Sequence, residues 1–158
     1  FTFGSPGSTS GRLMPTYFIM QNNGGVDPDR WFTQKPGFQM SGGHVATANA
    51  VADGTYQVGA INYKTYDDLV KSDPKIADNT VKIWTTPVYA DYNFTIHPEV
   101  ETLFGAGFIA KVQAALIAAP AGSDALKAIN RESVIAAKNE DFDGIKNTAV
   151  ELKLLDLY

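Results

Sequence analysis

Short apolar runs of strand type alternate with short helical patterns along the first half of this chain, and glycine-containing breaks separate them. The runs that read as strands are residues 2–3, 37–40, 56–61 and 81–85. The segments with helical spacing of apolar residues are 13–21, 45–52 and 63–71, with a short capped helix at 27–32. Alternation of this kind predicts an α/β fold, in which helices flank a sheet and crossover connections join its strands.

The second half of the chain changes character after an extended, aromatic-rich run at residues 89–96. Helical patterns predict one apolar helix over 100–119, a short helix over 124–130 and a last amphipathic helix near the end. Their apolar residues include Leu103, Phe104, Phe108, Val112, Leu116, Phe142, Ile145, Ala149, Leu152 and Leu155. Because no matching strands lie nearby, we expect these faces to need a partner surface, either a missing lobe or a second copy.

Composition excludes several classes of protein. The 158 residues carry a formal charge of -4, and the 13 basic residues are scattered, so a nucleic-acid partner is not expected. The longest apolar stretch, 108–120, contains Lys111 and Gln113 and is too short to cross a bilayer. A chain without cysteine has no disulfide, thiolate metal site or cysteine nucleophile. No cofactor or metal motif is present, and the start at Phe1 suggests a portion of a longer protein.

A loop of small residues at 4–11 carries the clearest chemical signal. It ends in Ser8-Thr9-Ser10-Gly11 and enters a helix, whose first N–H groups lack intrahelical partners and lie at the positive end of the dipole. Three hydroxyls beside these donors predict an oxyanion site, and a simple capped turn is the alternative. The continuation Gly11-Arg12-Leu13 is not that of a P-loop, and no G-x-S-x-G elbow surrounds Ser8 or Ser10.

Two further residues have side chains suited to an oxyanion. His44 follows two glycines at the start of a helix, where its imidazole can donate a hydrogen bond, more strongly when protonated; the alternative is a surface cap. Asp91 lies in the extended aromatic stretch and would favour a monoprotonated anion that donates to it; the alternative is a solvated aspartate in a turn. We expect both to line one cleft with the serine loop, and His97 to be structural.

In combination, these residues resemble the substrate-binding subunits of phosphonate and phosphite ABC importers. The resemblance covers nearly the whole chain. The segments that carry it are Ser8-Thr9-Ser10-Gly11-Arg12-Leu13-Met14-Pro15, Gly43-His44 with Ala46, Ala50 and Val51, Val58-Gly59-Ala60-Ile61-Asn62-Tyr63, and Trp84-Thr85-Thr86-Pro87 with Tyr89, Asp91 and Tyr92. It implies an α/β, type II periplasmic-binding-protein-like fold with a mixed sheet and flanking helices.

The resemblance also implies an organisation and a site. Residues 1–88 would form the second lobe, and 89–158 a hinge return strand with C-terminal helices that pack on a first lobe. Ser8, Thr9, Ser10, His44 and Asp91 would bind a phosphonate, phosphite or similar phosphorus oxyanion, without catalysis. A membrane permease would be the partner, and the location the periplasm or a lipid anchor at the outer face of the membrane. Gln57 departs from the family, where an acidic residue is common.

Two other functions fit the same residues. The first is an enzyme acting on a phosphorylated small molecule, with His44 and Asp91 as acid and base and the serine loop as a phosphate cradle. The second is an intracellular ligand-sensing domain built on the same lobe architecture, which requires a DNA-binding region elsewhere in the protein. Turnover distinguishes the enzyme from a binding protein, and the full gene sequence identifies the sensor.

Overall fold

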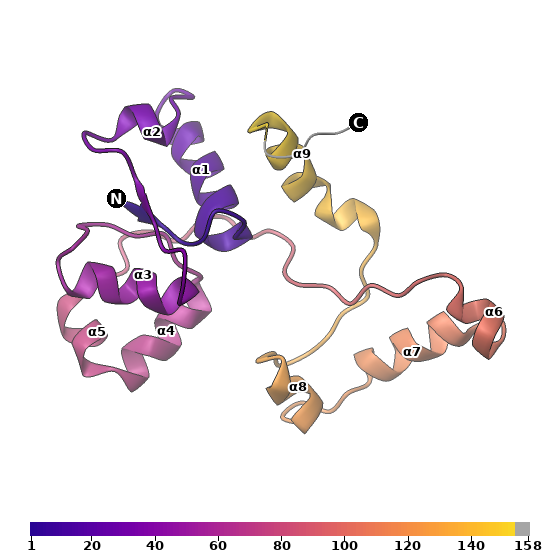
Figure 1. The fold of residues 1–158 in the computed structure, drawn as a ribbon. Coiled ribbons are helices and arrows are strands. Elements are labelled where there is room, and N and C mark those ends of the chain that lie inside the picture. Colours follow the sequence, from indigo (N-terminus) through magenta and orange to yellow (C-terminus); the bar gives the residue numbers. More distant parts are fainter. Residues whose placement is uncertain (154–158) are drawn as a thin grey trace. The chain divides into compact units, whose positions relative to one another are not determined.

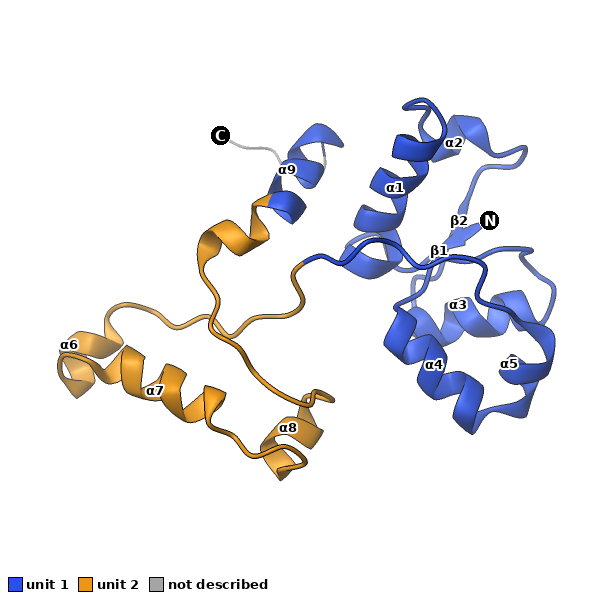
Figure 2. Cartoon of the chain, turned by 180° about the vertical axis from the view of Figure 1, so that it is seen from behind, with its two compact units in different colours: residues 1–89, 144–158 blue, residues 90–143 orange. Residues whose placement is uncertain are grey.

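A computed structural model describes residues 1–153 of the chain. The chain divides into two compact units, one made of residues 1–89 together with the segment from Gly144 onward, and one made of residues 90–143 (Figure 2). The division after residue 89 falls beside the boundary expected between the second lobe and the return segment. The assignment of 1–88 and 89–158 to lobes of a larger protein stays a prediction.

The sheet of the first unit is small and parallel. Strand β1 (Thr2–Phe3) pairs with β2 (Gly37–Phe38), and on its other side Thr2 forms a single bridge to Gly59. Thr2 donates to the Val58 carbonyl (2.9 Å), and its own carbonyl accepts from Ala60 (3.0 Å). Thr2 and Phe3 are fully buried, as expected for a strand with neighbours on both sides. The loop at 4–11 therefore begins directly at the end of the central strand.

Helices surround this sheet, as Figure 1 shows. The segment after the loop forms η1 (Thr9–Leu13) and continues as α1 (Met14–Asn22); α2 (Pro28–Trp31), α3 (Gly43–Ala52), α4 (Tyr63–Ser72) and α5 (Pro74–Asn79) follow. Pro15 is the second residue of α1, which continues directly from η1. The core formed by α3, α4 and α5 centres on Ala48, Tyr66 and Ile76. The predicted α/β class is confirmed, with a helix-rich unit around a small parallel sheet.

The second unit consists of short helices joined by extended segments. Its helices are α6 (Val100–Phe104), α7 (Phe108–Ile117), α8 (Asp124–Ala128) and η2 (Asn139–Phe142). The last helix, α9 (Asp143–Glu151), begins at the end of this unit, and its residues from Gly144 group with the first unit. Neither α6 nor α7 has a buried residue, whereas Leu126 of α8 is buried. The apolar faces of α6 and α7 are thus largely uncovered within the described residues, and Leu155 lies outside them.

Three sequence expectations about elements are wrong. The single helix over 100–119 is broken at Gly105 and Gly107, whose φ angles of 94° and 84° are left-handed and incompatible with a continuous helix. Residues 81–85 form no strand, and Ile83 is 74% exposed, because no partner strand lies beside them within residues 1–153. Residues 56–61 contribute only the bridge at Gly59, since β1 is too short to pair with more of them.

Candidate functional site

The serine loop caps the helix that follows it. Ser8 is the N-cap residue in an extended conformation, and its Oγ accepts from the N–H of Gly11 at 3.0 Å. The Ser8 carbonyl accepts from the N–H groups of Arg12 (2.9 Å) and Leu13 (3.0 Å). The N–H groups of Thr9 and Ser10 come before Arg12, the first residue whose N–H bonds to a helical carbonyl, and are therefore donors that this helix end can offer to an anion. The side chains of Ser8, Thr9 and Ser10 are partly exposed.

Close backbone packing fixes the shape of the loop. Gly4 donates to the Gly11 carbonyl at 2.8 Å, so the end of β1 lies directly against the start of the helix. A Cβ atom on Gly11 would lie 2.9 Å from Ser8 Oγ and 3.1 Å from Gly4 Cα, and one on Gly4 would lie 3.2 Å from Gly11 Cα. The room that Gly11 leaves is thus taken by Gly4 and Ser8.

His44 lies against this loop. Gly42 precedes α3 in the left-handed conformation (φ 75°), which turns the chain so that His44 falls in the first turn of the helix. Its Nε2 lies 3.2 Å from Ser10 Oγ, and its Nδ1 accepts from the N–H of Asn62 at 3.3 Å. The ring is half-buried, and this burial lowers the pKa of His44 below its usual value. Ser10 and His44 are brought together although 34 residues separate them in the sequence.

Asp91 belongs to the second unit, where it is bound by an arginine. Arg131 Nε and Nη2 donate to Asp91 Oδ2 (2.6 Å) and Oδ1 (2.9 Å), and the same guanidinium lies 5.4 Å from the ring centroid of Tyr92. The hydrogen bond from Arg131 is the main reason why the pKa of Asp91 is lowered. Asp91 is therefore an ionised, exposed acceptor, and its joining the serine loop and His44 in one cleft stays a prediction.

Sequence reasoning did not identify Asn62 or Arg131. Asn62 stands before the helical pattern of 63–71, and an asparagine in that place is the usual signal of an N-cap. The signal does not reveal that its backbone N–H reaches His44. Arg131 is 40 residues from Asp91, and no local pattern links the two. Arg12 follows the loop, and its guanidinium lies over the rings of Phe3 (4.2 Å) and Phe38 (5.1 Å). Its charge therefore makes cation–π contacts with the aromatic side chains of β1 and β2.

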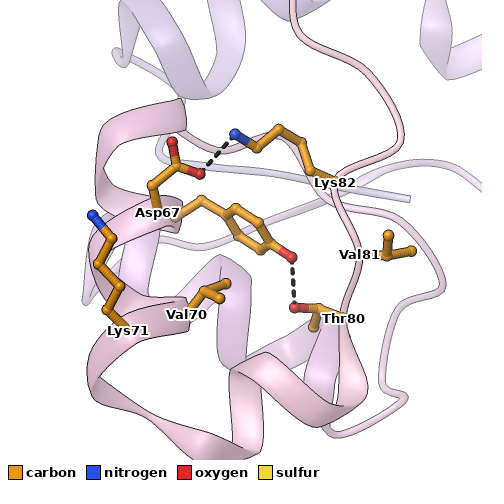
Figure 3. Close-up of a pocket in the computed structure, with 7 residues that line it drawn as sticks. Asp67, Val70, Lys71, Thr80, Val81 and Lys82 are labelled. Carbon is orange, nitrogen blue, oxygen red and sulfur yellow. Dashed lines mark hydrogen bonds and ion pairs between the residues drawn. The ribbon is translucent and has the colours of Figure 1, made fainter.

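A separate groove of about 350 Å³ lies between α4 and residues 80–82 (Figure 3). Its polar groups include Lys82, which pairs with Asp67 at 2.6 Å, and Tyr66, whose hydroxyl lies 3.0 Å from Thr80 Oγ1. Lys82 and Tyr66 are thus already engaged within the groove, whereas the start of η1 is a helix end, whose N–H groups and dipole favour an anion. The loop with His44 is therefore the better candidate site.

Within residues 1–153, no group of three or more His, Cys, Asp or Glu side chains is arranged to hold a metal ion. None of the helices in that part of the chain has the length and apolar character needed to span a membrane.

Fold and loop together define a class of protein. A central parallel strand ends in a loop that presents hydroxyls and helix N–H groups, which is the place where open α/β sheets bind anions. The class is therefore an α/β domain of the ligand-binding type.

Comparison with known proteins assigns the family. A family model described as "ABC transporter, phosphonate, periplasmic substrate-binding protein" matches residues 1–142. The chain belongs to this family of periplasmic substrate-binding proteins.

The relatives are consistent with the family and with the fold. The probable ABC transporter phosphite binding protein PhnD1 of Prochlorococcus marinus (strain MIT 9301) is 34% identical over 156 residues, which cover 96% of this chain and 51% of the relative. The structure of PhnD1 from the same organism in complex with methylphosphonate superposes with a TM-score of 0.80 at 33% identity, covering 98% of this chain and 57% of that one. The chain thus spans about half the length of the relative that it matches.

Proposed function

We propose that this chain is part of a solute-binding protein that captures a small phosphorus oxyanion, a phosphonate or phosphite, for an ABC importer. The family supports this, as do a relative described as phosphite-binding and a structural neighbour that holds methylphosphonate. The single observation that carries the proposal is the serine loop at a helix N-terminus with His44 on Ser10. Hydroxyls and N–H groups converge there, which suits an oxyanion, and binding without turnover is the activity that the family supports.

Each predicted residue has a role in this proposal. Thr9 and Ser10 donate backbone N–H and hydroxyl hydrogens to the ligand oxygens, and Ser8 holds the loop by capping Gly11. His44, whose Nε2 lies 3.2 Å from Ser10 Oγ, binds the same ligand from α3. Asp91 keeps the role of accepting a hydrogen from a protonated ligand oxygen, for which an ionised carboxylate is required.

The remaining elements of the proposal concern the whole protein. A membrane permease is the partner that receives the ligand, and the location is the periplasm or a lipid anchor at the outer face of the membrane. The uncovered apolar residues of α6 and α7 pack on the part of the protein that corresponds to the other half of the relative, or on a second copy.

Calorimetric titration tests the proposal. We expect the chain to bind methylphosphonate or phosphite more tightly than sulfate, because sulfate has no proton to donate to Asp91. Ser10→Ala should weaken binding about tenfold through loss of a hydrogen bond to a charged ligand. Ser72→Ala, on the exposed face of α4, is the matched control and should bind like the wild type.

Two results would contradict the proposal. If the wild type and Ser10→Ala bound every phosphorus oxyanion with equal affinity, the serine loop would not be part of the binding site. Release of phosphate from a phosphorylated small molecule, followed by phosphorus NMR, would favour the enzyme instead.

A further inference from the structure

The carboxylate of Asp91 is held by three hydrogen bonds that leave one acceptor position open. Oδ1 accepts from Arg131 Nη2 at 2.9 Å and from the backbone N–H of Tyr92 at 2.8 Å, and Oδ2 accepts from Arg131 Nε at 2.6 Å. Each carboxylate oxygen has two lone pairs, so among the described residues both pairs of Oδ1 are engaged and one pair of Oδ2 is not. Since the Asp91 side chain is more than half exposed, a ligand hydroxyl can reach it.

The end of α8 places the arginine that makes two of these bonds. Asn130 follows the helix with a left-handed φ of 53°, a conformation that asparagine adopts more readily than most residues. Its N–H bonds to the Lys127 carbonyl and the N–H of Arg131 to the Leu126 carbonyl, each at 3.0 Å, which is the Schellman pattern of a helix C-terminus. Because Leu126 is buried, the backbone of Arg131 is tied to a residue that is itself held in place.

The guanidinium of Arg131 has further contacts besides the carboxylate. Its Nη1 donates to the Asn130 carbonyl at 2.9 Å, and the group lies 5.4 Å from the ring centroid of Tyr92. Nε and Nη2 then face the two oxygens of Asp91 side by side, an arrangement that arginine can form and lysine cannot. The carboxylate cannot rotate without breaking both bonds, so Arg131 sets the direction of the open lone pair. The same pairing lowers the pKa of Asp91 and keeps it an acceptor.

We propose that Arg131 is a positioning residue for ligand selection: by holding the carboxylate of Asp91 in one orientation, it directs the open lone pair of Oδ2 at a hydroxyl of the bound oxyanion. Such an acceptor favours a ligand oxygen that carries a proton over an anion that has none, because an ionised carboxylate has no hydrogen to donate. The inference rests on the proposed function, in which Asp91 contacts the ligand. It adds a residue 40 positions away that acts through Asp91 and not on the ligand itself.

The preference of the chain for methylphosphonate over sulfate, measured by titration at mildly acidic pH, tests this role. Methylphosphonate then has one proton and one negative charge, whereas sulfate has two negative charges and no proton. We expect Arg131→Gln to lower the preference about fivefold, because a carboxylate that can rotate accepts the ligand hydrogen less well. Loss of a positive charge alone would act in the opposite direction, since it weakens the binding of doubly charged sulfate more. A preference that rises or stays the same in Arg131→Gln, shown to be folded by circular dichroism, would overturn the proposal.

Asp91→Asn shows whether Arg131 acts through Asp91. Asparagine keeps an acceptor oxygen but not the charge and should lower the preference by itself, and the addition of Arg131→Gln should lower it no further. A further drop in the double variant would mean that Arg131 contacts the ligand directly, against the positioning role. Lys127→Gln removes a neighbouring positive charge that pairs with Asp124 and is the matched control, which should keep the preference of the wild type.

The same titrations separate this inference from the proposed function. If the wild type bound neither methylphosphonate nor phosphite, the proposed function would be wrong, and the role of Arg131 with it. If the wild type bound them and the folded Arg131→Gln variant kept its preference, the proposed function would stand and only the role of Arg131 would be wrong.

Discussion

Two glycines in the same loop differ sharply in what they permit. Gly11 has Ser8 and Gly4 within contact distance of any added Cβ, whereas around Gly7 nothing lies within 4 Å. Neither residue has a positive φ, so the difference is one of space rather than of backbone conformation. The loop is therefore tightly packed at its helical end and open at its tip.

Gly11→Ala should damage both the stability and the binding of the chain. The new methyl group would force Ser8 and the end of β1 apart, at a cost of about 1–3 kcal/mol. Urea denaturation and titration with methylphosphonate measure the two effects. Gly7→Ala is the control in the same loop and should leave both unchanged. A Gly11→Ala variant as stable as Gly7→Ala would mean that the loop is not packed in this way.

The ion pair between Asp91 and Arg131 should make the stability of the chain depend on pH. Arg131 lowers the pKa of Asp91 in the folded chain, so the pair contributes stability above the unfolded pKa of about 3.9, and this contribution is lost as pH falls through the folded pKa. Because the Asp91 side chain is 58% exposed, solvent screening limits the contribution to about 1 kcal/mol or less.

Carboxyl titration by NMR checks this prediction. Arg131→Gln should raise the pKa of Asp91 toward its ordinary value. Lys127→Gln removes a neighbouring positive charge that pairs with Asp124 instead and should leave Asp91 unchanged. If Arg131→Gln had no effect, the pair would not be formed in solution.

At the scale of elements, one carboxylate connects α6 with the start of α7. Glu101 accepts from the N–H groups of Gly107, Phe108 (3.2 Å) and Ile109 (2.9 Å), so a residue in the first turn of α6 caps α7. A negative charge at the start of a helix is also favoured by the dipole. The two helices are thereby held as a pair, and the rings of Phe104 and Phe108 stack with centroids 4.6 Å apart.

Glu101→Ala should loosen the start of α7. Loss of the cap would cost about 1 kcal/mol and speed hydrogen exchange at residues 107–109. Glu99→Gln removes the same charge from an exposed side chain nearby and serves as the control. Exchange at 107–109 that is equal in the two variants would show that the cap does not form.

At the scale of the whole molecule, the second unit keeps large apolar side chains in solvent. Leu103 is 73% and Phe104 65% exposed, whereas Leu126 is 2% exposed. Apolar area of this kind on a soluble protein marks an interaction surface. The chain spans about half of its relative, in agreement with the proposal that further protein covers this surface.

Leu103→Ser should reduce self-association of the chain without lowering its unfolding midpoint, because the side chain is already exposed. Leu126→Ser, at a buried position, should instead lower the midpoint strongly. Size-exclusion chromatography with light scattering and thermal unfolding give the two readouts. A monomeric wild type that Leu103→Ser destabilises as much as Leu126→Ser would show that Leu103 is buried within this chain, against the two-lobe assignment.

The sequence alone determined the features that depend on neighbours along the chain. Helical spacing between glycine-containing breaks predicted helices over 13–21, 45–52 and 63–71, which lie within two residues of those in the structure. Small residues before a helix predicted the loop at 8–10 that caps η1. The motifs also pointed to the family to which the chain belongs. These signals are local because caps, dipoles and helical spacing act within a few residues.

Only the tertiary structure decided the features that depend on distant partners. Residues 81–85 have strand-forming side chains, but a strand exists only where another strand satisfies its N–H and carbonyl groups. The contacts of His44 with Ser10 and with the N–H of Asn62, and the pairing of Asp91 with Arg131, join residues 18 to 40 positions apart. Such contacts are fixed by how elements pack, because no local pattern in the sequence encodes the distance between two side chains on different helices.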